Sequence, residues 1–178
     1  MKYFLKALAI IILIFTIFVL HIGVANTLPY PFNNINVIFL ILAWQIFFNN
    51  RPRAIWYMLP LAFLMELFTS APFGINSISL FVSLISTKWL LDNLFTNRSV
   101  YIVFLSSAVS LAIYRLVFIT LIYFINFFFY HVKIGVSKFF LDVGVEILFT
   151  SILMTGFYFI HFFFIKKFNP KYLSDRHI

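Results

Sequence analysis

The sequence predicts an all-α, polytopic integral membrane protein with about six transmembrane helices and both ends of the chain in the cytoplasm. The chain of 178 residues is 63% hydrophobic and only 10% charged, whereas soluble domains are about 45–50% apolar and about 25% charged. A soluble core of this size cannot bury so much apolar surface. Long apolar runs alternate with short polar segments, and basic residues gather at the edges of the runs. We therefore expect one transmembrane domain over residues 1–178.

The first apolar run, 4–22, is expected to be an uncleaved transmembrane helix. A signal peptide is the alternative, because Gly23-Val24-Ala25 resembles a small-residue cleavage site. The run is longer than the apolar part of a typical signal peptide, about 7–15 residues. This length favours the helix.

Five further runs complete the expected helices. The second run, 35–48, is short for a full span, which needs about 20 residues. The third run, 54–70, begins with aromatic residues of the type that rest at a membrane interface. The remaining expected helices are 75–91, 100–130 and 139–165, followed by a polar cytoplasmic tail at 166–178.

Basic residues predict the orientation of these helices. With six spans and a cytoplasmic N-terminus, the outer loops hold only Lys133 and Lys138, and Arg115 lies within the membrane. Cytoplasmic loops of membrane proteins carry an excess of Lys and Arg, so this arrangement is favoured over its reverse. The ten basic residues that it places inside are Lys2, Lys6, Arg51, Arg53, Lys88, Arg98, Lys166, Lys167, Lys171 and Arg176.

The segment Glu66–Ser79 is expected to form a hairpin that is the working surface of the protein. An acid near the end of one apolar run is followed by a turn, Ala71-Pro72-Phe73-Gly74, in which Pro72 stiffens the backbone and Gly74 is expected at positive φ. Small polar residues then recur on one face of the next helix, either to pack closely against another helix or to line a polar cavity. The predicted partner-binding residues are Pro72, Gly74, Asn76, Ser79 and Ser83.

Three intramembrane charges lie at similar predicted depth. Glu66 is about 18 Å and Arg115 about 22 Å from the inner ends of their helices, and Glu146 is about 12 Å from an outer end. A charge inside a membrane is costly unless it is paired. We therefore expect a Glu66–Arg115–Glu146 cluster that fixes helix packing, with a proton or substrate site as the alternative.

No motif of a known catalytic, cofactor or metal site is present. The chain has no cysteine, and it lacks the nucleotide-binding, nucleophile-elbow and zinc-protease patterns. The net charge of +8 lies at the edges of apolar runs rather than in a stripe, which argues against nucleic acid as a partner. We expect a protein without catalytic activity or a cofactor, in contact with the lipid bilayer.

The stretch Met65–Leu80 resembles the hallmark segment of the MreD family of rod-shape-determining membrane proteins. Its acid, Leu-Phe-Thr-Ser, Pro-Phe-Gly and small-residue helix match the family pattern, although Glu66 stands where Asp is usual and Ser79 where a small apolar residue is usual. The resemblance covers about residues 51–95. It implies a non-enzymatic subunit of the cell-elongation complex in the bacterial inner membrane, associated with an MreC-like periplasmic scaffold protein.

The MreD fold is similar to that of the substrate-binding subunits of energy-coupling-factor vitamin transporters, so such a subunit is the alternative function. Those subunits tend to dock through an Ala-x-x-x-Ala pattern on the first helix. Here Ala7 and Ala9 are followed by Ile11 and Leu13, so the pattern is missing. A membrane-embedded lipid enzyme is a third possibility, disfavoured because no His or acid pair is placed at a headgroup interface.

Overall fold

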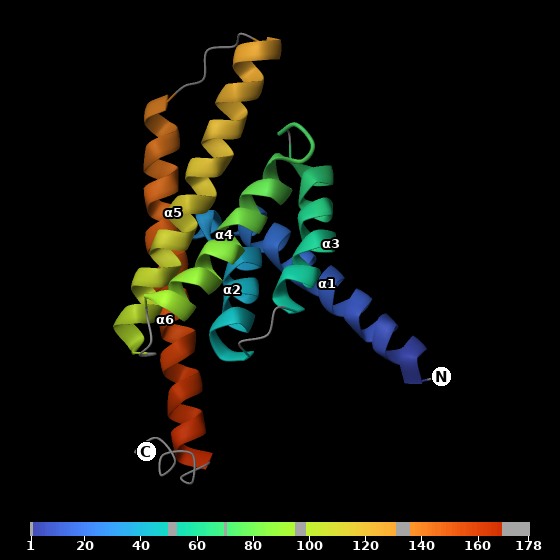
Figure 1. The fold of residues 1–178 in the computed structure, drawn as a ribbon, viewed down its shortest axis with the longest axis vertical. Helices are drawn as coiled ribbons and strands as arrows, with labels where there is room; N and C mark the ends of the chain where they lie inside the picture. The colour runs from blue at the N-terminus through green and yellow to red at the C-terminus, as the bar shows by residue number, and fades with distance from the viewer. Residues whose placement is uncertain (1, 50–52, 70, 95–98, 131–135, 169–178) are drawn as a thin grey trace.

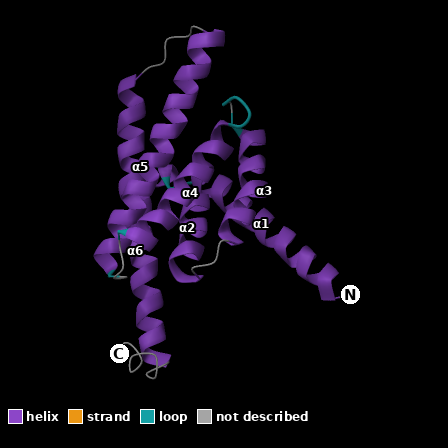
Figure 2. Cartoon of the chain, viewed as in Figure 1, coloured by secondary structure: helices purple, strands orange, loops and turns teal. Residues whose placement is uncertain are grey.

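The computed structural model describes residues 2–49, 53–69, 71–94, 99–130 and 136–168, and every regular element in these ranges is a helix. The all-α prediction is therefore confirmed (Figures 1 and 2). The elements are α1 (Lys2–Thr27), the 3₁₀ helix η1 (Phe32–Asn34), α2 (Val37–Asn49), α3 (Arg53–Phe68), α4 (Ile75–Asn93), α5 (Val100–Ile125), the π-helical turn η2 (Asn126–Tyr130) and α6 (Val136–Phe168).

Each expected run corresponds to one α-helix, with different ends. The helix expected at 4–22 continues to Thr27, because nothing before Pro29 prevents it from doing so; Pro29 and Pro31 then lie in the connection to α2. The last helix begins at Val136 rather than at 139. Position 70 and the part of the expected tail from 169 onward lie outside the described residues.

Consecutive helices run in alternating directions. In Figure 1 the ends of α3 and α5 and the start of α4 lie toward the top, while the start of α1 and the end of α6 lie toward the bottom. The alternation brings the end of α1, the starts of α2 and α4, the end of α3 and the first half of α6 to one side of the bundle. Polar residues from these segments meet there.

Helix α2 occupies the centre of the bundle. It contacts each of the other five α-helices, and Ile38, Phe39, Leu42 and Phe47 on it are almost fully buried. A helix that is apolar on all sides is stable only where other helices surround it. With 13 residues it is about 20 Å long, so it is the short helix that the sequence predicts.

Small hydroxyl side chains form the contact between α4 and α5. The Ser83 hydroxyl donates to the Ser110 carbonyl oxygen across the interface, at 2.8 Å. Most of the other hydroxyls in the contact donate to carbonyls of their own helix, which leaves little polar surface unsatisfied. Small residues let membrane helices approach closely. The fully buried members of this small-residue contact are Ser79, Ser83, Thr87, Ser106, Ser107 and Ser110.

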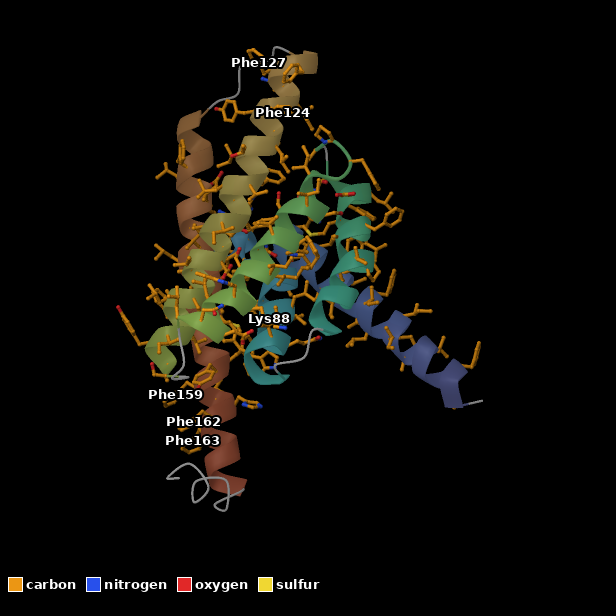
Figure 3. The ribbon with its side chains drawn as sticks, in the orientation of Figure 1. Lys88, Phe124, Phe127, Phe159, Phe162 and Phe163 are labelled. Carbon is orange, nitrogen blue, oxygen red and sulfur yellow. The ribbon has the colours of Figure 1, made fainter. Side chains whose placement is uncertain are left out.

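Three stretches of the described residues are long and apolar enough to cross a membrane: Leu8–Thr27, Val100–Phe128 and Phe140–Phe163. Val37–Phe47 and Leu59–Phe68 are shorter apolar helical stretches. Large apolar side chains cover the outside of the bundle. Figure 3 shows exposed phenylalanines at two places, Phe124 and Phe127 where α5 and η2 end at the top, and Phe159, Phe162 and Phe163 on the lower part of α6.

Candidate functional site: a polar cavity inside the helix bundle

Arg115 of α5 and Glu146 of α6 form an ion pair in which the carboxylate is buried and the guanidinium is partly buried. Both Nε and Nη2 of the guanidinium contact Oε2 of the carboxylate. The guanidinium carbon also lies 5.3 Å from the Tyr114 ring centre and 5.6 Å from the Phe118 ring centre, within the range of a cation–π contact. The Glu146 side chain is 2% exposed and that of Arg115 is 25% exposed. The pair fixes how α5 and α6 are rotated against each other.

Asn36 ties this ion pair to the central helix. It precedes α2, and its Oδ1 accepts the Phe39 backbone N–H at 3.0 Å, the geometry of an N-cap. Its Nδ2 donates to Glu146 Oε1 at 3.0 Å, and its backbone N–H donates to Thr150 Oγ1 at 3.1 Å. One asparagine thus ends the η1 connection, starts α2 and orients the carboxylate that holds Arg115.

Glu66 does not join this pair, so the expected three-charge cluster is corrected to a two-charge pair. Glu66 Oε1 instead accepts the Ser77 backbone N–H at 3.0 Å and the Ser77 hydroxyl at 2.7 Å. Ser77 lies in the first turn of α4, where N–H groups have no partner within the helix and where negative charge is stabilised. Among the described residues α3 packs against α1, α2 and α4 but has no contact with α5, which explains why the two groups stay apart.

Asn76 links the hairpin to α5. Its Nδ2 donates to Thr69 Oγ1 at 2.9 Å, and its Oδ1 accepts the Tyr114 hydroxyl at 3.4 Å. Tyr114 is the neighbour of Arg115 in the chain, so two polar networks meet on α5. One network comes from the α3–α4 hairpin and the other from α2 and α6.

A cavity of about 320 Å³ lies between these two networks. Such a volume is at the lower end of the range for small-molecule sites, about 300–1,000 Å³. Most of the residues that line it have polar side chains, which include one guanidinium, two carboxylates, one imidazole and several amides. The lining includes the charged or hydrogen-bonding side chains of His21, Asn33, Asn34, Arg115, Asp142 and Glu146.

Three of the lining residues carry a buried polar atom without a hydrogen-bond partner in the described part of the chain. These atoms are Nδ1 of His21, Oδ1 of Asn33 and Nδ2 of Asn34. Buried polar atoms in folded proteins nearly always have a partner, which is protein, ordered water or ligand. Polar groups around a cavity of this size are therefore positioned to bind what enters it. Within the described ranges, no three His, Cys, Asp or Glu residues are grouped as metal ligands.

The expected partner-binding face of α4 is also corrected. Asn76, Ser79 and Ser83 are buried among the helices of this chain and are not part of its surface. The interpretation as a close-packing face is the right one for Ser79 and Ser83, whereas Asn76 lines the cavity. Gly74 has the positive φ expected of it, 97°, at the N-terminus of α4. Pro72 is half-buried in the same turn.

Sequence reasoning missed Asn36, His21 and Asp142 as members of the site. Asn36 was recognisable, because an asparagine directly before an apolar run is a strong N-cap signal. Asp142 was visible as an acid one helical turn before Glu146, a spacing that places two residues on the same face. His21 gives no sequence signal of its own, since its place at the cavity depends on how the end of α1 packs against η1.

Comparison with models of known protein families, with curated proteins and with solved structures finds no match to this chain.

Proposed function

We propose that the chain is a non-enzymatic, multi-pass subunit of a cell-elongation complex in the bacterial inner membrane, similar to MreD, and that it binds an MreC-like periplasmic scaffold protein. The observation that carries the proposal is the corner between α3 and α4, in the stretch that resembles the family. There Glu66 accepts two hydrogen bonds from Ser77, and Gly74 supplies the left-handed backbone conformation. Glu66 and Gly74, eight residues apart in the chain, therefore both determine how α4 begins.

The surface proposed for the partner is the turn itself, residues 71–74. Phe73 is 70% exposed, and its ring lies 5.8 Å from that of Phe63 in an edge-to-face contact. The Glu66 contacts hold the start of α4 next to α3, which restrains the turn between them. A preorganised aromatic residue at the end of a helical hairpin is a suitable anchor for a partner chain.

Capture of the scaffold protein tests this function. When the chain is produced in membranes together with the MreC-like protein of the same bacterium, we expect the two to co-purify. Phe73→Ser is expected to weaken the complex at least about tenfold, because truncating an aromatic anchor typically costs 2 kcal/mol or more. The matched control is Phe163→Ser, which changes another exposed phenylalanine, near the C-terminal end of α6 on the lower side of the bundle.

Two outcomes contradict the proposal at different levels. If the unaltered chain and the scaffold protein do not associate, the elongation-complex function is wrong. If they associate and Phe73→Ser binds as well as Phe163→Ser, the function stands and the proposed surface is wrong.

The proposal includes six spans with both ends of the chain in the cytoplasm, supported by the asymmetry of basic residues. Reporter fusions after Asn34, Asn97 and Ile178 are expected to give outside, inside and inside signals, respectively. An outside signal at Ile178 would exclude the topology.

A second candidate function, the substrate-binding subunit of an energy-coupling-factor-type transporter, is favoured by the polar cavity. The same capture experiment distinguishes the two. Co-purification of a pair of ATPase subunits in place of the scaffold protein would favour transport.

A further inference from the structure

We propose that the cavity is a binding site for a small polar primary amine, with the Asp142 carboxylate as the counter-charge of its ammonium group. The inference goes beyond the scaffold function, and it holds whichever partner the chain assembles with. It is carried by the distribution of charge and of unpartnered hydrogen-bonding atoms around the cavity.

The charge of the wall favours a cation. One guanidinium faces two carboxylates, so the lining has a formal charge of −1 with His21 neutral. The guanidinium is already matched, because Glu146 accepts from it through Oε2 and from Asn36 through Oε1. Asp142 forms no hydrogen bond or ion pair with any residue that the structure describes. The Asp142 carboxylate interacts with the Arg115 guanidinium only through space, so it is the negative charge at the cavity that has no contacting partner among the described residues.

The unpartnered atoms favour a ligand that is rich in donors. Asn33 Oδ1 can only accept, and His21 Nδ1 accepts in the tautomer whose proton lies on Nε2. Together with the Asp142 carboxylate, these make three acceptors. The Asn34 Nδ2 group is a donor that needs one acceptor. A primary ammonium supplies three donors and no acceptor, and one hydroxyl oxygen nearby would satisfy Asn34.

The apolar part of the wall limits the size and shape of the ligand. Met65, Phe118 and Val143 complete the lining, so the carbon skeleton has apolar side chains to contact. The wall is held rigidly on one side by the Arg115–Glu146–Asn36 contacts and on the other by the Asn76 contacts to Thr69 and Tyr114. A preorganised wall binds without a further ordering cost.

Three polyols that differ at one end test the proposal. Glucamine, sorbitol and gluconate share a linear skeleton of six carbons that ends in an ammonium, a hydroxyl and a carboxylate, respectively. Their binding to the full chain, purified in detergent, is measured by calorimetry and by the shift in melting temperature. We expect glucamine to bind at least about tenfold more tightly than sorbitol, because only its ammonium group carries a charge opposite to that of the Asp142 carboxylate.

The matched pair of variants is Asp142→Asn and Asp92→Asn. Asp142 forms no hydrogen bond or ion pair with the described residues, so its replacement is expected to leave folding intact and to remove the preference for glucamine. Asp92 is exposed near the C-terminal end of α4, away from the cavity, so its replacement should leave the preference unchanged. Elution volume and helical circular dichroism of both variants report on folding.

Four results would overturn the proposal. Absence of binding by all three compounds would indicate a cavity occupied by water only. Equal binding of glucamine and sorbitol would mean that the cavity does not distinguish an ammonium group from a hydroxyl group. Preference for gluconate would assign recognition to Arg115, and a glucamine preference that survives Asp142→Asn would place the amine elsewhere. None of these results depends on whether the scaffold protein is captured.

Discussion

Replacing Glu146 with alanine is expected to lower the free energy of unfolding by about 3–5 kcal/mol, the usual cost of removing one partner from a buried ion pair. The change leaves the Arg115 guanidinium without its carboxylate and the Asn36 amide without an acceptor, so α5, α6 and the start of α2 lose a shared contact. The measurement is unfolding by denaturant in detergent micelles, followed by helical circular dichroism.

A double-mutant cycle shows whether the loss belongs to the pair. Replacing both charges, Arg115→Met with Glu146→Leu, is expected to cost much less than the sum of the single changes, because no uncompensated charge remains. The parallel cycle of Glu66→Ala with Arg115→Met is expected to be additive, since the two side chains bind different partners. Strong coupling in the second cycle, or additivity in the first, would contradict the contacts described above.

Replacing Ser83 with phenylalanine is expected to separate α4 from α5 and to lower the folded yield severely. Overpacking a tight interface typically costs about 1–3 kcal/mol. At this position the hydrogen bond to the Ser110 carbonyl is lost as well, at about 1 kcal/mol more. Ser79→Phe should act in the same way, because Ser79 is equally buried in the small-residue contact. The measurement is the monodisperse fraction in size-exclusion chromatography and the melting temperature.

The control is Ile78→Phe, a change of similar bulk on the same helix at a side chain that is 51% exposed. It should be tolerated, because the Ile78 side chain lies on the exposed side of α4. If Ser79 instead belonged to the partner-binding face that the sequence predicts, Ser79→Phe would leave folding intact and remove the partner. A stable, well-folded Ser79→Phe protein would contradict the close packing of Ser79 within the chain and would favour the partner-binding interpretation.

The sequence by itself determined the helical class and the number and order of the helices. Both follow from residues that are close together in the chain, since an apolar run forms each helix and a proline or a cluster of polar residues ends it. Gly74 was predictable for the same reason, because a positive φ at a turn depends only on the residue and its neighbours in the chain. The expected depths of Arg115 and Glu146 were also calculated from their positions in the chain alone, since the rise per residue of an α-helix is constant.

Only the tertiary structure decided which charges meet and which face of α4 is buried. Depth along a helix does not determine how the helix is rotated about its axis or which helix lies beside it. Because α3 packs on α4 and not on α5, Glu66 binds the start of α4 and leaves Arg115 to Glu146. The cavity arises in the same way, because its wall comes from segments that are far apart in the chain and meet only when all six helices are packed.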